Sequence, residues 1–261
     1  MSFEFDGEKY KKASAHQKEW ANTILGELHF NGNEIILDLG CGDGTITNQL
    51  AEMVPAGKVV GIDASEGMIK TALKDKKQSN VHFEQRDINE ISYTEEFDFI
   101  FSNATLHWVK DHTKLLKNIF KALKNNGALR FNFAADGNCS HFFKVIRQAM
   151  NKKEYRQYFK SYPWPWFMPT IEEYQKLAKE AEFSEIEIWG ENADRYFEDT
   201  ETMIKWIDQP SIVPFVRHIP QPEKENFRNY VVEQMIKETK QEDGTCFETF
   251  RRVNVKAVKT H

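Results

Sequence analysis

The sequence predicts an α/β protein built on a doubly wound, largely parallel sheet with a helical lid. Short apolar runs alternate with helical patterns up to about residue 134. This alternation is typical of βαβ units, whose right-handed crossovers cover both faces of a parallel sheet. Gly40, Gly42 and Gly44 follow the first apolar run at alternate positions, so that the first strand is predicted to end in a flexible loop. After residue 134 the alternation stops.

Each predicted element has its own signal. Apolar residues at helical spacing predict an N-terminal capping helix over 8–29, which the NGN turn at 31–33 ends. Short apolar runs predict five strands, at 34–39, 58–63, 81–87, 97–103 and 128–134. Helical patterns lie between them at 45–54, 65–77 and 112–127, the last with a glycine stop.

The second half of the chain has a different, mainly helical pattern. Helical patterns occur at 140–150, 152–159, 171–183 and through most of 200–240, whereas prolines make 161–170 irregular. Alternating residues predict late strands at 185–195 and 245–258. We therefore expect one domain with four parts: a capping helix (1–33), a cofactor-binding core (34–134), an insertion forming a lid and the substrate site (135–184), and the last two strands with a helical cap at 200–240 (185–261).

Composition restricts the class of protein. The 261 residues carry a net charge of −5, which argues against a large nucleic-acid interface because that would favour a basic face. The cysteines, Cys41, Cys139 and Cys246, are odd in number and show no disulfide or zinc spacing. The charged N-terminus lacks a secretory apolar region, and no apolar run approaches the length of a membrane span. We expect a cytoplasmic protein, a monomer or weak homo-oligomer, that binds neither membranes nor nucleic acid.

The glycine loop distinguishes between two classes of ligand. A dinucleotide fingerprint needs a third small residue at position 45, where this chain has Thr45. Asp38 lies two residues before the loop, where a carboxylate repels pyrophosphate and suits an ammonium group. Asp63 ends the second strand, where it can bind both hydroxyls of a ribose. Asp87 ends the predicted third strand, where it can accept from an adenine amine while Ile88 packs on the ring.

A ligand with an ammonium group, a ribose and an adenine but no phosphate is S-adenosyl-L-methionine. The segments DLGCGDG, GIDASEGMI, RDI and FDFIFSNATLHWV, in this order, resemble the motif series of class I S-adenosylmethionine-dependent methyltransferases over residues 34–134. The resemblance implies a Rossmann-like seven-stranded sheet with an antiparallel last strand. It implies these cofactor-binding residues: Asp38, Gly40, Cys41, Gly42, Gly44, Asp63, Ala64, Met68, Asp87, Ile88, Asn103 and Ala104.

Further segments narrow the resemblance. YKKASAHQKEW (10–20), SNATLHWVKDH (102–112) and ETMIKWIDQPSIVPFV (201–216) are similar to segments of the trans-aconitate and juvenile hormone acid methyltransferases. That group methylates carboxylates of small molecules, so the resemblance implies an O-methyltransferase acting on a small acid. We expect no metal site. It adds Tyr10 and Ser14 to the cofactor site. Residues 135–182 match this group poorly, which leaves the substrate open.

Gln17, Trp108 and His107 are the candidate catalytic residues. The amide of Gln17 and the indole N–H of Trp108 can orient a carboxylate, which is ionised at pH 7 and needs no general base. His107 can serve as base if the acceptor is a hydroxyl or a heterocyclic nitrogen. Each also has a structural interpretation, as a solvated helix residue, a packed aromatic or a hydrogen-bonded histidine. A second carboxylate could be bound by any of Arg130, Arg147, Arg217 and Arg252. A nicotinamide oxidoreductase and a non-catalytic S-adenosylmethionine-binding module are the remaining alternatives.

Overall fold

The computed structural model describes residues 15–260, which form two compact units. The first unit contains the chain up to Ala135, Trp166–Glu191 and the chain from Val253 onward. The second contains Asp136–Pro165 and Asn192–Arg252. The predicted cofactor core (34–134) therefore falls in the first unit, together with parts of the two predicted late strands and with residues 166–184, which the sequence analysis assigned to the lid.

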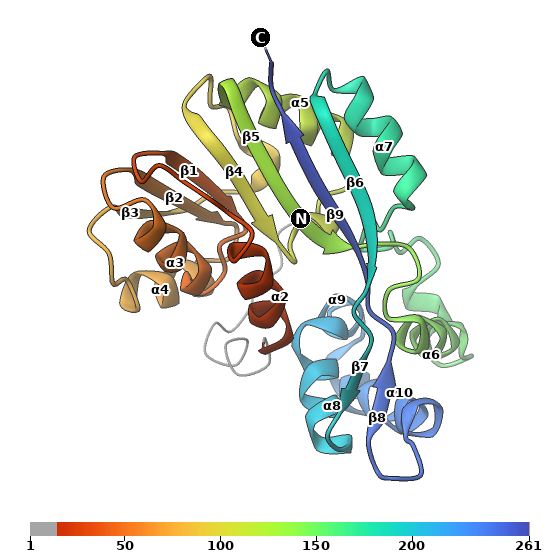
Figure 1. Cartoon of the computed structure of the whole chain (residues 1–261). Coiled ribbons are helices and arrows are strands. Elements are labelled where there is room, and N and C mark those ends of the chain that lie inside the picture. The colour runs from red at the N-terminus through yellow and green to blue at the C-terminus, as the bar shows by residue number, and fades with distance from the viewer. Residues whose placement is uncertain (1–14, 261) are drawn as a thin grey trace. The chain divides into compact units, whose positions relative to one another are not determined.

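The first unit is built on a seven-stranded sheet with the order β3-β2-β1-β4-β5-β9-β6 (Figure 1). Its strands are β1 (Ile35–Leu39), β2 (Lys58–Asp63), β3 (Val81–Gln85), β4 (Phe97–Asn103), β5 (Leu123–Ala134), β6 (Ser184–Asn192) and β9 (Arg251–Val258). Strands β1 to β5 pair in parallel, and Figure 1 shows β9 running against its neighbours. The strand order reverses between β1 and β4, so a ligand site is expected at the carboxyl ends of these strands.

Helices cover both faces of this sheet. They are α2 (Ala15–Leu25), α3 (Thr45–Met53), α4 (Glu66–Lys74), α5 (His112–Ala122) and α7 (Ile171–Glu180), with short 3-10 turns η1 (Ile88–Glu90) and η2 (Leu106–Trp108). Side chains alternate across a strand, so Ile36 of β1 packs with α2, α3 and α4, whereas Leu37 packs with α5 and α7. Both side chains are fully buried. The continuous apolar strands of the sequence are thus strands buried on both faces.

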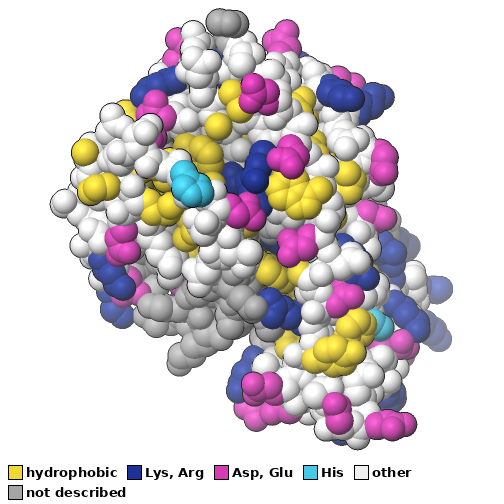
Figure 2. Space-filling model, in the orientation of Figure 1, with side chains coloured by type: hydrophobic (Ala, Val, Ile, Leu, Met, Phe, Trp, Pro, Cys, Tyr) yellow, Lys and Arg dark blue, Asp and Glu magenta, His cyan; other side chains and the backbone are white. Residues whose placement is uncertain are grey.

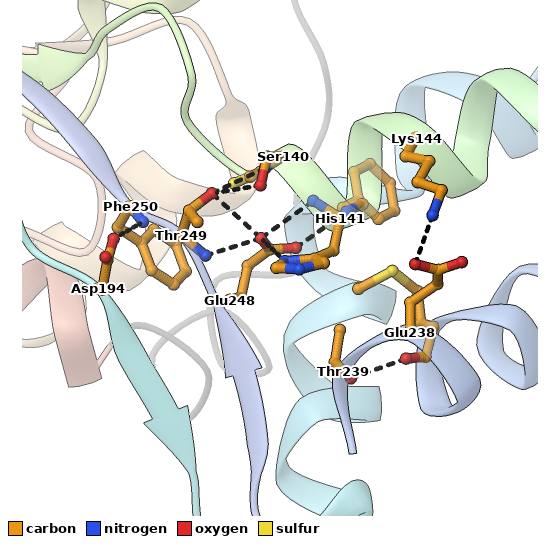
Figure 3. A network of polar contacts seen from close by, with 12 residues as sticks. Ser140, His141, Lys144, Asp194, Glu238, Thr239, Glu248, Thr249 and Phe250 are labelled. Carbon is orange, nitrogen blue, oxygen red and sulfur yellow. Dashed lines mark hydrogen bonds and ion pairs between the residues drawn. The ribbon is translucent and has the colours of Figure 1, made fainter. Parts of the chain in front are cut away.

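The second unit is mainly helical. Its elements are α6 (Ser140–Asn151), η3 (Arg156–Tyr158), β7 (Arg195–Phe197), α8 (Thr200–Trp206), the π-helical turn η4 (Ile207–Ser211), α9 (Val213–Val216), η5 (Gln221–Glu223), α10 (Lys224–Thr239) and β8 (Cys246–Glu248). Strands β7 and β8 form a separate antiparallel pair. Glu248 is fully buried, and its carboxylate accepts hydrogen bonds from the backbone N–H groups of His141 and Phe142 (Figure 3). A negative group at this place stabilises the N-terminus of α6.

Three predicted elements are wrong in extent. The helix over 112–127 ends at Ala122, because Leu123 is buried against the sheet and pairs with Phe97, and the following Lys124 ammonium bonds to Asp98. The strand over 245–258 is two strands, because the Glu248 carboxylate is held at α6 and the ladder breaks before Arg251. The predicted helix over 152–159 contains only the turn η3 in the structure.

The remaining elements agree with the predictions to within a few residues, except that residues 8–14 lie outside the described part.

Figure 2 shows acidic and basic side chains intermixed on one face of the molecule, without a broad basic surface among the described residues there. Within residues 15–260, no helix combines the length and the apolar character of a membrane span. The three cysteines are buried and unpaired with one another.

Candidate active site

The glycine loop joins β1 to α3 at the carboxyl edge of the sheet. Gly42 has φ +55°, in the left-handed region that favours glycine, and a Cβ there meets nothing within 4 Å. Gly44 has φ +76°, and a Cβ there lies 2.6 Å from the Phe83 ring and 2.9 Å from the Ala72 methyl group. The two glycines therefore serve different purposes. Gly44 allows α3 to pack against the core, whereas Gly42 keeps a backbone surface open.

The backbone N–H groups of this loop point into the protein. Those of Gly40 and Cys41 both donate to the carbonyl of Ile62, at 2.8 and 2.9 Å. The N–H of Gly42 donates to the Asp63 carboxylate at 3.1 Å. A phosphate-binding loop directs its N–H groups at the ligand. This loop is thus poorly suited to a pyrophosphate, which supports the interpretation drawn from the glycine spacing.

Asp38 lies near the end of β1, two residues before the loop, and its side chain is 2% exposed. The Thr47 hydroxyl, on the first turn of α3, donates to its carboxylate at 2.7 Å. Burial raises the pKa of Asp38 to about 7, helped by the nearby Asp63 charge and opposed by the Thr47 hydrogen bond. A buried carboxylate with one neutral donor favours a cationic ligand, because a positive charge offsets the cost of its burial.

Asp63 ends β2 and is held by two backbone donors. Gly42 N–H donates to one carboxylate oxygen and Ser65 N–H to the other, at 2.9 Å for the latter. The Ser65 hydroxyl in turn accepts from Met68 N–H and caps α4. Ala64 lies between Asp63 and Ser65 in the sequence. Asp63, Ala64 and Met68 are thus brought together beside the loop. A carboxylate fixed in this way is already oriented for the two hydroxyls of a ribose.

Asp87 and Ile88 follow β3 at the same edge. The Asp87 carboxylate accepts from Asn89 through its backbone N–H at 2.9 Å and its side-chain amide at 2.7 Å. Both bonds use the same oxygen, so the other oxygen can accept from an adenine amine. Ile88 is buried in the core below it. The structure therefore places these two residues next to the predicted ribose site but puts Ile88 mostly out of reach of solvent.

The end of β4 completes the edge. Ala104 has φ +56°, and its N–H donates to the Asn132 carbonyl at 2.7 Å. The Thr105 methyl carbon would lie 2.1 Å from a Cβ at Gly40. The turn after Asn103 thus fits against the glycine loop only because Gly40 has no side chain.

His107 and Trp108 lie on the turn η2, which packs against residues 166 and 167. The His107 carbonyl accepts from Phe167 N–H at 2.8 Å, and the Lys110 ammonium donates to the Trp166 carbonyl at 2.9 Å. The ring centroids of Trp108 and Trp166 lie 5.5 Å apart. This contact gives the carboxyl edge an aromatic wall, formed by Trp108 and Trp166.

His112 supports that wall from below. It is 2% exposed, with Nε2 3.0 Å from the Leu106 carbonyl oxygen and Nδ1 3.1 Å from the Tyr174 hydroxyl. A carbonyl only accepts, so Nε2 carries the hydrogen and Tyr174 donates to Nδ1. Burial lowers the pKa of His112 to about 4, which keeps the ring neutral. His112 thereby holds the turn that carries His107 and Trp108.

Three predicted site residues cannot be placed in this way. Tyr10 and Ser14 lie outside the described residues, and of Gln17 the structure describes only its backbone, in α2. Of the arginines considered for a second carboxylate, Arg130 is buried and bonds to Asn254 and Glu27. It is therefore part of the structure of the sheet.

Sequence reasoning missed Thr47 and His112. Thr47 stands nine positions after Asp38 in the predicted helix, and its partner could have been found only by placing that helix against β1. His112 lies within a segment that the sequence did single out, but its contact with Tyr174 spans 62 positions. Contacts of this length have no local signal.

Comparison with known proteins agrees with this site. A family model described as a methyltransferase domain matches residues 30–201. Malonyl-[acyl-carrier protein] O-methyltransferase of Acetivibrio thermocellus is 34% identical over 134 residues, which are 51% of this chain and span about half (47%) of that enzyme. Trans-aconitate 2-methyltransferase of Escherichia coli is 26% identical over 258 residues, 96% of each chain.

A solved structure supports the fold. Phosphoethanolamine N-methyltransferase 2 of Haemonchus contortus, in complex with S-adenosyl-L-methionine, matches with a TM-score of 0.61 and 19% sequence identity. The match covers 98% of this chain and 57% of that one. With the seven-stranded sheet and the loop described above, these matches establish the family and its cofactor. The chain belongs to the methyltransferase-domain family, the class I S-adenosylmethionine-dependent methyltransferases.

Proposed function

We propose that this protein transfers the methyl group of S-adenosylmethionine to a carboxylate of a small molecule, giving a methyl ester. The observation that carries the cofactor part is the inward-facing loop between Asp38 and Asp63, which offers carboxylates where a dinucleotide site offers N–H groups. The acceptor part is supported by the full-length similarity to trans-aconitate 2-methyltransferase and by the shorter one to malonyl-[acyl-carrier protein] O-methyltransferase. Both acceptor names denote molecules that carry carboxylates.

Each residue proposed for cofactor binding contacts a different part of S-adenosylmethionine. Asp38 takes the ammonium group and Asp63 the ribose, while Asp87 and Ile88 face the adenine. When bound, S-adenosylmethionine supplies a sulfonium methyl carbon to which a nucleophilic oxygen can add while the carbon–sulfur bond breaks. Tyr10, Ser14, Met68, Asn103 and Ala104 remain proposed contacts at the rim of this site.

Trp108 and Gln17 are proposed to orient the acceptor. Each offers a neutral N–H donor, which suits a carboxylate and does not repel the nearby sulfonium as a cation would. Attack by an anion on a cation cancels both charges, so the aromatic wall of Trp108 and Trp166 favours the step by excluding water. No proton has to be removed. His107 then has no role as a base.

The pH dependence of the reaction tests this proposal. A carboxylate acceptor requires no base that titrates near neutral pH, so kcat should not fall as pH decreases from about 8 to 6. A panel of small mono-, di- and tricarboxylic acids is first screened with methyl-labelled S-adenosylmethionine. If kcat instead decreases with a single protonation near pH 6 to 7, and this pH dependence disappears in His107→Ala, the acceptor is a hydroxyl or a heterocyclic nitrogen.

A further inference from the structure

The Asp38 carboxylate lies in an unusual electrostatic environment. Asp63 on β2 faces it with a like charge, and Asp43 and the Cys41 thiol lie on the adjoining loop. The strand β4 presents Phe101 as its register partner. Among the described residues that act on the Asp38 charge, Thr47 is the one that stabilises the ionised form.

An ionised carboxylate in this place is costly. The side chain is 2% exposed, so water contributes little to its stabilisation, and a neighbouring carboxylate opposes a second negative charge. The Thr47 hydroxyl is a single neutral donor, fully buried and 2.7 Å away. At pH 7 the carboxyl group is therefore about half protonated until a cation arrives. An ammonium group, in contact directly or through one water, supplies that cation.

We infer that Thr47 is a positioning residue for the amino-acid part of the cofactor, and that binding of this part expels a proton from Asp38. This inference rests on the proposed assignment of the ammonium group to Asp38. Thr47 both fixes the direction of the carboxylate and favours its ionised form. The proton leaves to solvent as the ammonium group binds, so that one positive charge replaces another in the site.

The linkage has a definite sign. The pKa of Asp38 is near 7 without a ligand and is lowered by a bound cation. Binding at pH 7 should thus release about half a proton per site, and affinity should increase as pH rises from about 5.5 to 7. Removing the Thr47 hydroxyl raises the pKa further, which shifts proton release to higher pH and weakens binding at pH 7.

Calorimetry with two ligands tests the inference. S-adenosylhomocysteine carries the amino-acid part, whereas 5′-methylthioadenosine has the adenosine and the sulfur but lacks it. Titrations in buffers of different ionisation enthalpy give the protons released. In the wild type, S-adenosylhomocysteine should release protons and 5′-methylthioadenosine should release none.

The variants separate positioning from general damage. Thr47→Val should bind S-adenosylhomocysteine about 10-fold more weakly, the effect of losing one hydrogen bond to a charged group. It should bind 5′-methylthioadenosine as the wild type does and should release more than about half a proton with S-adenosylhomocysteine at pH 7, because its Asp38 pKa is higher. Thr47→Ser should restore the wild-type affinity and proton count. Equal loss for both ligands, or wild-type affinity and proton count in Thr47→Val, would overturn the inference.

The variant Asp38→Asn tests proton release separately from the proposed binding of the ammonium group by Asp38. Asparagine keeps the shape and can accept from Thr47, but it cannot ionise. It should abolish proton release and weaken S-adenosylhomocysteine alone. If Asp38→Asn leaves that affinity unchanged, the assignment of the ammonium group to Asp38 fails as well. If Asp38→Asn weakens binding but proton release persists, only the inference drawn here fails.

Discussion

The backbone N–H of Gly42 donates to the Asp63 carboxylate at 3.1 Å, across 21 positions of the sequence. This bond ties the glycine loop after β1 to the end of β2. It fixes the loop and the carboxylate with respect to each other before any ligand binds. The proposed ammonium and ribose contacts are consequently parts of one preorganised edge of the sheet.

Replacing Asp63 by alanine should weaken S-adenosylmethionine binding. The variant loses the proposed charge-assisted bonds to the ribose, each worth about 1.5 to 3 kcal/mol, so affinity should fall by at least about 10-fold. Calorimetry measures the change. Glu66→Gln is a matched control, because Glu66 is an exposed carboxylate three positions away, 2.6 Å from the Lys70 ammonium. Unchanged affinity in Asp63→Ala would remove Asp63 from the site.

Alanine substitutions at Gly42 and Gly44 should distinguish the two roles of the loop, which are cofactor binding and the packing of α3. Gly42→Ala should weaken cofactor binding at a modest cost in stability of about 1 to 2 kcal/mol, since its Cβ meets only open space. Gly44→Ala should be less stable still, because its Cβ meets Phe83 at 2.6 Å. Gly244→Ala is the control, with φ +91° and nothing within 4 Å.

Thermal unfolding and cofactor titration are measured on each of these variants. The control should lose stability like Gly42→Ala and retain wild-type affinity for S-adenosylmethionine. If Gly42→Ala also retains that affinity, the cofactor does not lie on this loop.

The free energy of unfolding should decrease in acid because His112 is buried in its neutral form. Burial lowers its pKa to about 4 from an ordinary value of 6.5, so between these pH values the unfolded chain binds a proton that the folded chain does not. The free energy of unfolding therefore decreases as pH falls through this window, by roughly 3 kcal/mol for this group. Urea unfolding of the wild type and of His112→Phe at pH 7 and pH 4.5 measures it. The variant should lose less stability on acidification, and an equal loss in both proteins would show that His112 does not titrate in this way.

The first half of the fold was predictable because its signals are local. Apolar runs such as 58–63 are bounded by turn residues, and the matching strand β2 has the predicted bounds. The end of α5 was not predictable. The sequence places a glycine stop at Gly127, but the helix ends at Ala122 because Leu123 gains more from burial in the sheet than from another helical turn.

The sequence signals for the proposed site are also local. Asp38 and Asp63 lie at the ends of β1 and β2 and Asp87 follows β3, and parallel strands bring their carboxyl ends to one edge. The groups that hold these residues were not predictable. Thr47 and His112 act through contacts between elements distant in the sequence, and only the packing of α3 and α7 on the sheet reveals them.

Trp108→Phe and Gln17→Ala should impair turnover while leaving the cofactor in place. Each removes a neutral donor to a charged acceptor, worth about 1.5 to 3 kcal/mol, which corresponds to roughly 10- to 150-fold in kcat if the bond forms fully in the transition state. Phenylalanine preserves an aromatic ring beside Trp166, so the wall stays packed. Steady-state kinetics and calorimetry are compared on the same samples. Weak S-adenosylmethionine binding in both variants, or full turnover in both, would contradict the proposed role.

The chemical nature of the methylated product tests the proposed carboxylate acceptor most directly. The enzyme is incubated with methyl-labelled S-adenosylmethionine and the acid that gives the highest transfer, and the product is then treated with mild alkali. A methyl ester is hydrolysed under these conditions, so the label should be recovered as methanol and the starting acid regenerated. Label that remains in an alkali-stable ether or N-methyl product would contradict methyl transfer to a carboxylate.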